Sequence, residues 1–117
     1  MEELNLRNYA HLGDAVWELK VRNQTIFLTH NIKELHKLTT EKVNASYQAE
    51  VLRLIEPMLS EFEQELVRRA RNLSVPVSRR SIQSDYRQAT AFEVLVGYLY
   101  LNNKSRLDEL YSIEGVL

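Results

Sequence analysis

The chain has 117 residues, of which 44% are apolar and 26% are charged, so we expect one packed domain over residues 1–117 and not a disordered chain. It contains no cysteine, which excludes disulfide frameworks, thiolate zinc sites and cysteine nucleophiles. No apolar run approaches the ~20 residues needed to cross a bilayer, so we expect no membrane partner. The start of the chain is acidic where a targeting peptide would be basic. We therefore expect a cytoplasmic location, with an organelle or plastid left open.

The first half of the chain predicts three helices. Apolar residues at helical spacing indicate a helix from Leu6 to Ile26, and Gly13 inside it costs about 1 kcal/mol relative to alanine, which suggests a closely packed neighbour at that point. A short helical segment over 32–38 follows. Thr39 and Thr40 then offer N-cap hydroxyls to a helix over about 43–55, which we expect to end or bend at Pro57.

The second half predicts three more helices around one loop. Ser60 and Glu63 match a capping box that opens a helix through Ala70, and the irregular stretch 72–84 is typical of an exposed loop. Helical spacing resumes from Asp85 through 99, and a last short helix is expected over 105–111. With three glycines, two prolines and no alternation typical of strands, the predicted fold class is an all-α helical bundle.

Two acidic residues lie on predicted apolar helix faces. Asp14 has Ala10, Trp17 and Val21 at helical spacings, and Glu93 lies in a comparable apolar stripe. A buried unpaired carboxylate is costly, so each needs a partner. A salt bridge with one of the arginines is the simpler hypothesis; a divalent cation with oxygen ligands is the other, and the spacing does not decide whether the two acids converge.

The motifs around these acids resemble those of a known nuclease family. The segment 11–16, His-Leu-Gly-Asp-Ala-Val, is similar to the second half of the ribonuclease III signature. The segment 90–100, beginning Thr-Ala-Phe-Glu, resembles the second catalytic helix of that family, and the order and separation of the two segments also agree. The likeness extends from about Tyr9 to Leu110.

Two departures refine the resemblance. A standard ribonuclease III has acids where this chain has Ala10 and Thr90, and Mini-ribonuclease III proteins lack the same two acids and carry no appended double-stranded RNA-binding domain. The resemblance therefore implies a ribonuclease III-type endonuclease that hydrolyses phosphodiester bonds in double-stranded RNA. It implies Mg²⁺, with Mn²⁺ as a substitute, held by Asp14 and Glu93 as catalytic and metal-binding residues. The number of metal ions is left open.

Basic residues concentrate near the predicted loop. Duplex RNA is recognised mainly through its shape and phosphates, so an arginine-rich stretch beside the catalytic helix suits an RNA contact, and a solvated basic face is the alternative. With the family resemblance, the candidate RNA-binding residues are Arg68, Arg69, Arg71, Asn72, Arg79, Arg80, Tyr86, Arg87 and, more weakly, Gln48.

The resemblance also implies partners. Family members work as two-fold dimers, and the aromatic residues Trp17 and Phe92 to Tyr100 provide apolar surface compatible with an interface between two copies. The implied substrate is the precursor of large-subunit (23S) ribosomal RNA, with a ribosomal protein as a further candidate partner. Two alternatives stay open: an inactive ribonuclease III-like RNA-binding or ribosome-associated scaffold, against which the retention of both acids argues, and a helical adaptor for an acidic protein.

Overall fold

The computed structural model describes residues 5–73 and 83–117, and these residues contain helices and no strand. The helices are α1 (Leu6–Thr25), α2 (Ile32–Thr40), α3 (Ala45–Ile55), the 3-10 turn η1 (Glu56–Met58), α4 (Glu61–Arg71), α5 (Gln83–Asn102) and α6 (Lys104–Tyr111). The all-α prediction is confirmed, and the observed elements lie close to the predicted ones.

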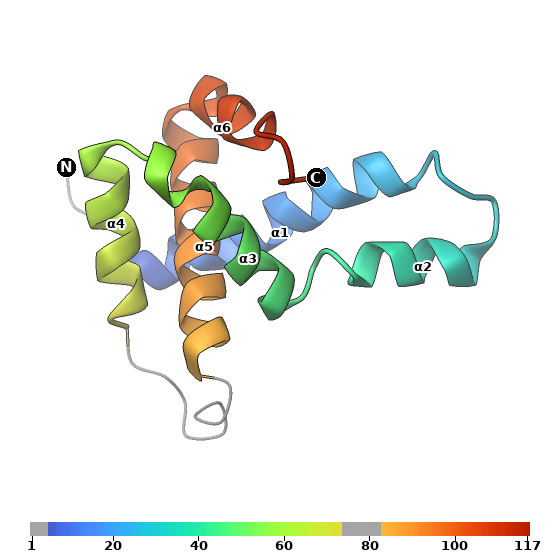
Figure 1. The fold of residues 1–117 in the computed structure, drawn as a ribbon, viewed down its shortest axis with the longest axis horizontal. Helices are drawn as coiled ribbons and strands as arrows, with labels where there is room; N and C mark the ends of the chain where they lie inside the picture. The colour runs from blue at the N-terminus through green and yellow to red at the C-terminus, as the bar shows by residue number, and fades with distance from the viewer. Residues whose placement is uncertain (1–4, 74–82) are drawn as a thin grey trace.

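Helix α5 is the centre of the bundle. It packs against α1, α3, α4 and α6, and Figure 1 shows it running between α4 and α3 while α1 crosses behind it. A helix surrounded by other helices must be apolar on nearly every side, and α5 meets this requirement with a run of buried residues from Ala91 through Gly97 that only Glu93 interrupts. Glu93 therefore stands out as the polar residue in the middle of the central helix.

Local sequence features set the ends of α3 and α4 as predicted. Helix α3 ends at Ile55, and Pro57 lies in the 3-10 turn that follows. The capping box is present, because the Ser60 hydroxyl accepts a hydrogen bond from the Glu63 backbone N–H and the Glu63 carboxylate accepts one from the Ser60 N–H.

The Glu63 carboxylate also joins α4 to α6. Arg106 donates to both of its oxygens at 2.9 Å and to the carbonyl of Met58. Burial alone would raise the pKa of Glu63, but the hydrogen bonds from Arg106 and Ser60 outweigh it and hold the pKa below its usual range.

The predicted N-cap of the third helix is wrong. Thr39 and Thr40 belong to the last turn of α2, where their hydroxyls donate to the carbonyls of Leu35 and His36 one turn back. Threonine makes this bond readily inside a helix, so it is a weaker stop signal than its N-cap preference suggests. Asn44 caps α3 instead, with its side chain accepting from the Tyr47 N–H.

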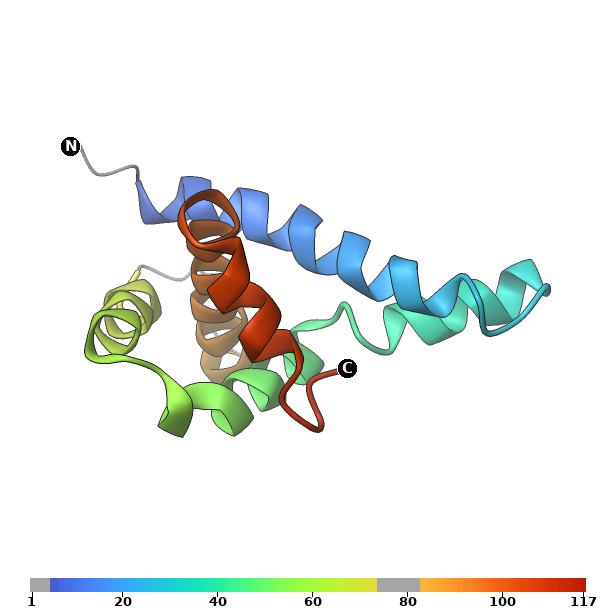
Figure 2. The same ribbon diagram turned by 90° about the horizontal axis from the view of Figure 1, so that it is seen from above.

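Helices α1 and α2 form an arm that extends beyond the rest of the bundle (Figures 1 and 2). The buried hydroxyls of Thr25 and Thr39 join the two helices by a hydrogen bond of 2.9 Å. Large apolar side chains are exposed along the turn between the helices and at the start of α2, with Phe27 at 86% and Ile32 at 76%. No helix among the described residues is long and apolar enough to cross a membrane.

The suggestion that Trp17 and Phe92 to Tyr100 provide interface surface is wrong for Trp17 and Phe92, whereas Tyr100 is 36% exposed. Trp17 is 0% exposed and Phe92 is 2% exposed within the single chain. Their rings pack edge to face, with centroids 5.1 Å apart, and the Trp17 indole N–H donates to the carbonyl of Lys42. Both aromatic side chains are buried in the core, because the helix faces that carry them, on α1 and α5, pack against each other.

Candidate active site

Two glycines bring the backbones of α1 and α5 into direct contact. A Cβ atom added at Gly13 would lie 1.8 Å from the backbone oxygen of Glu93, and one added at Gly97 would lie 2.0 Å from that of Tyr9. These separations are far below any van der Waals contact, so no residue with a side chain fits at either position. The expected close neighbour of Gly13 is confirmed, and it is the backbone of Glu93.

This crossing brings the two predicted carboxylates together. Asp14 is exposed and follows Gly13, while Glu93 is partly buried on the facing helix. The two carboxyl groups lie within hydrogen-bonding reach of each other when Glu93 is protonated. Burial, followed by the hydrogen bond and the charge of Asp14, raises the pKa of Glu93 to about 8. The carboxyl groups of Asp14 and Glu93 therefore lie together without a compensating charge among the described residues.

The salt-bridge hypothesis for these acids finds no support among the described residues. Arginines in this part of the chain pair with other acids, for example Arg22 with Glu18 and Arg106 with Glu63. In the described part of the chain, neither Asp14 nor Glu93 forms an ion pair with a basic side chain. The hypothesis that a divalent cation is held by both acids stays a prediction.

The donor set fits a hard divalent cation. Mg²⁺ prefers oxygen ligands, keeps several waters and needs only one or two protein carboxylates, with substrate phosphate oxygens completing its shell. Two carboxylates in contact, one of them open to solvent, meet this need. No third histidine, cysteine or acid joins them within the described ranges, and Ala10 and Thr90 supply no carboxylate nearby. Such a site depends on water and substrate for its remaining ligands.

A third polar group reaches the pair from α3. Gln48 is 3% exposed, and its amide interacts with the Glu93 carboxylate. Its buried Nε2 nevertheless has no hydrogen-bond partner of good geometry among the described residues. The neighbouring Tyr47 has a structural contact, since its hydroxyl donates to the carbonyl of Val116.

The family of the chain follows from comparison with known proteins. A model of the ribonuclease III domain matches residues 7–104, which contain both carboxylates and both glycines of the crossing. The chain belongs to the ribonuclease III family. It is 42% identical to the Mini-ribonuclease 3 of Synechocystis over 89% of this chain and 73% of that protein, and 42% identical to the Mini-ribonuclease 3 of Gloeobacter violaceus over 92% and 79%.

A solved structure agrees with this assignment. The crystal structure of a Fusobacterium nucleatum protein superposes with a TM-score of 0.86 at 32% identity, covering 97% of this chain and 93% of that one. Together these similarities place the chain among the Mini-ribonuclease III proteins and make it an endoribonuclease of the ribonuclease III family.

Two of the predicted RNA-binding arginines in this Mini-ribonuclease III make internal contacts. Arg71, at the end of α4, pairs with Glu56 and donates to the side-chain oxygen of Gln88 at 2.8 Å. Arg87, on α5, donates to the carbonyls of Arg71 and Leu73 at 2.6 and 3.2 Å. These contacts join the end of α4 to the first turns of α5.

The other predicted RNA contacts differ in their placement. Arg68, Arg69 and Asn72 are exposed near the end of α4, where Arg68 pairs with Glu65, and Tyr86 is partly buried on α5. Arg79 and Arg80 lie outside the described residues. Gln48 is buried, so little of its side chain is open to an external ligand.

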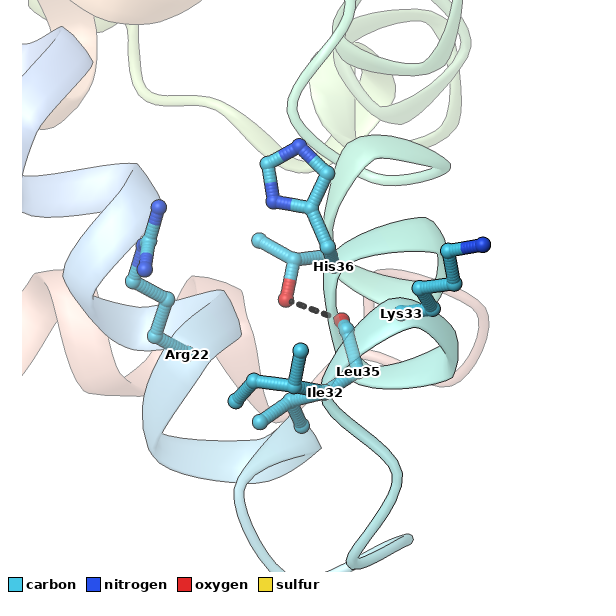
Figure 3. A pocket seen from close by; sticks show the side chains of 6 residues that line it. Arg22, Ile32, Lys33, Leu35 and His36 are labelled. Carbon is cyan, nitrogen blue, oxygen red and sulfur yellow. Dashed lines mark hydrogen bonds between the residues drawn. The ribbon is translucent and has the colours of Figure 1, made fainter.

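A hollow on the arm has a different chemistry from the carboxylate pair. It encloses about 390 Å³, and Figure 3 shows Arg22 of α1 facing Ile32 and His36 of α2 across it. Lys33, Leu35 and Thr39 complete its lining, which contains no acid. Arg22, which lines the hollow, lies eight residues after Asp14, so the two residues are about 12 Å apart along the axis of α1.

The sequence analysis missed one residue of the site. Gly97 makes the second backbone contact of the crossing, four residues after Glu93. A glycine in the middle of an otherwise apolar helix is costly, and this was the available indication of a close helix neighbour.

Proposed function

We propose that the chain is a magnesium-dependent endoribonuclease that hydrolyses double-stranded RNA, with Asp14 and Glu93 as its catalytic, metal-binding residues. The observation that carries the proposal is the placement of the two carboxylates against each other at the crossing of Gly13 and Gly97, without a basic partner in the described residues. Mn²⁺ has similar ligand preferences and is expected to substitute for Mg²⁺.

The two acids have different tasks in this proposal. Asp14 and Glu93 would hold a divalent cation, which would supply activation of water and stabilisation of the negative charge on the phosphate. Glu93, partly buried on the central helix, holds a fixed ligand position. Asp14 is exposed and presents its carboxylate toward the solvent side, where the RNA backbone approaches.

The RNA surface that we propose follows the end of α4 and the start of α5. Arg68, Arg69 and Asn72 are exposed there, and the predicted contacts Arg79 and Arg80 belong to the intervening chain. Contacts of this kind neutralise phosphates and bind a duplex without reading its sequence. Arg71 and Arg87 support the same surface by joining the two helix ends.

We further propose that residues 1–117 act as one nuclease domain and that two copies form a cytoplasmic homodimer. Its proposed substrate is the precursor of large-subunit (23S) ribosomal RNA, and a ribosomal protein is a candidate for presenting this substrate. The exposed apolar side chains of the arm, Phe27 and Ile32 among them, support association with a second copy, since monomeric proteins rarely expose contiguous apolar patches.

The test is cleavage of a labelled RNA duplex by the purified protein with Mg²⁺, with Mn²⁺ and with EDTA. The Asp14→Asn and Glu93→Gln variants keep the side-chain shapes and remove the charges, so each is expected to lower cleavage at least 100-fold while circular dichroism shows an intact helical fold. Glu34→Gln, an exposed acid on α2, is the matched control and should cleave like the wild type.

Cleavage that survives both substitutions would contradict the assignment of the site. A wild-type protein that binds the duplex with high affinity and never cuts it would favour the inactive scaffold instead. A protein that neither binds nor cuts any duplex, even with ribosomal protein present, would favour a helical adaptor.

A further inference from the structure

The amide of Gln48 is the least satisfied polar group beside the carboxylate pair. Its α3 stripe continues through Leu52 and Ile55, which are buried against the core. A core position on this stripe is expected to hold an apolar side chain. Here it holds a glutamine that is 3% exposed and whose Nε2 has no hydrogen-bond partner of good geometry among the described residues.

An amide in this position does not serve the stability of the fold. A buried donor without an acceptor loses its hydrogen bonds to water and gains none in return, so an apolar side chain of the same length would fold at least as well. The residue that faces the amide is Glu93, on the helix against which α3 packs. A group that is unfavourable for folding and is directed at a catalytic carboxylate suggests a role in positioning it.

We propose that Gln48 is a positioning residue, whose Nε2–H donates a hydrogen bond to one oxygen of Glu93 and thereby turns the other oxygen toward Asp14 when a divalent cation binds. An outer-shell donor of this kind fixes a ligand that would otherwise rotate. This inference rests on the proposed function, because it assigns Gln48 to the same cation site.

The experiment compares Gln48→Met with the wild type and with Gln24→Met, an exposed glutamine of α1 that serves as the matched control. Methionine has a similar length and flexibility and no N–H to donate. Three quantities are measured: the melting temperature without metal, the affinity for Mn²⁺ alone by calorimetry, and the rate of duplex cleavage.

Without metal, Gln48→Met is expected to melt at or above the wild-type temperature. Its Mn²⁺ affinity and its kcat are each expected to fall about 10–100-fold, as for other outer-shell partners of metal ligands, with little change in KM for the duplex. In a Glu93→Gln background, Gln48→Met should cause no further loss of Mn²⁺ affinity, because the carboxylate that it orients is gone.

A Gln48→Met protein that binds Mn²⁺ and cuts like the wild type would overturn the inference and leave the proposed function intact. Losses that simply add to those of Glu93→Gln would also overturn it, since they indicate a general packing defect. A wild type that binds no Mn²⁺ and cuts no duplex would overturn both proposals.

If Gln48→Met does not fold, NMR of the wild type provides the decisive measurement. Addition of Mg²⁺ should shift the Gln48 side-chain amide protons and slow their exchange, and the same addition to Glu93→Gln should do neither. Unchanged amide signals in a wild type that binds Mg²⁺ would contradict the hydrogen bond.

Discussion

At the scale of single residues, the proposed site consists of two acids whose surroundings differ. Asp14 faces solvent, whereas Glu93 lies partly buried in the central helix of the bundle and beside another carboxylate. Each of these conditions disfavours the ionised form of Glu93, and without a cation the chain must tolerate both. The site is therefore built at the expense of stability in the metal-free protein, as is common where charges are collected for catalysis.

The Glu93→Gln substitution should reveal how much the Glu93 carboxylate lowers the free energy of unfolding of the metal-free protein. The pKa of Glu93 in the folded chain is about 8, against 4.5 for an ordinary glutamate, so the folded state binds the proton more tightly than the unfolded state does. The wild type therefore loses stability as the pH rises from about 4.5 to about 8, while a glutamine at this position does not titrate.

Urea denaturation without metal should show the variant and the wild type equally stable near pH 4.5. At pH 8 the variant should be more stable than the wild type by about 1–3 kcal/mol, because its glutamine carries no charge. Solvent that reaches the partly buried Glu93 of the wild type screens its charge, and this limits the difference. Mg²⁺ should stabilise only the wild type. A difference that is constant across this pH range would contradict the pKa of Glu93.

At the scale of elements, the site depends on how closely α1 and α5 approach. Neither helix holds both acids, and the acids meet because Gly13 and Gly97 remove the side chains that would separate the backbones. Other contacts hold the surrounding helices: Arg106 joins α6 to α4 through Glu63, and Arg71 and Arg87 join the end of α4 to α5.

Gly13→Ala tests this crossing. In an open helix the change would stabilise by about 1 kcal/mol through helix propensity. Here the new methyl group meets the backbone oxygen of Glu93, which cannot move without shifting α5, so we expect destabilisation by about 3 kcal/mol or more and loss of Mn²⁺ binding. Asn23→Ala, an exposed position of α1, is the matched control and should change the free energy of unfolding little. A Gly13→Ala protein as stable as the wild type would show that the helices are farther apart.

At the scale of the whole molecule, the arm of α1 and α2 separates an apolar surface from the reaction site. The arm extends beyond the bundle (Figure 2), and its turn carries exposed apolar side chains. The carboxylates of Asp14 and Glu93 belong to the crossing of α1 and α5, where Gly13 contacts the Glu93 backbone. Surface of this kind is unfavourable in water unless another protein covers it. In the proposed homodimer a second copy covers it, and both copies contribute the same residues.

Phe27→Ser tests this surface. The wild type is expected to have the mass of a dimer in light scattering, and the substitution should weaken association at least tenfold, since it removes an 86% exposed aromatic side chain from the interface. Met58→Ser changes another exposed apolar residue, in η1, and should leave the dimer intact. A monomeric wild type at micromolar concentration would contradict the homodimer.

Much of the fold followed from local sequence features. Helical spacing predicted the helices, and the capping box at Ser60 and Glu63 was found as expected. The N-cap of α3 was misplaced because threonine hydroxyls serve equally well inside the last turn of a helix. Trp17 and Phe92 were misjudged as surface because a list of apolar residues does not tell which faces meet.

The sequence by itself indicated that Glu93 needs a partner, because an acid in an apolar stripe is costly where the stripe packs. The same prediction for Asp14 is wrong, since its side chain is exposed. Only the tertiary structure decided that the two acids are brought together, with Gln48 buried against Glu93 and Arg71 and Arg87 engaged in internal contacts. The physical reason is that helix periodicity defines the faces of each helix separately. The distance between two faces depends on contacts such as the Gly13–Glu93 backbone approach, which join residues 80 positions apart.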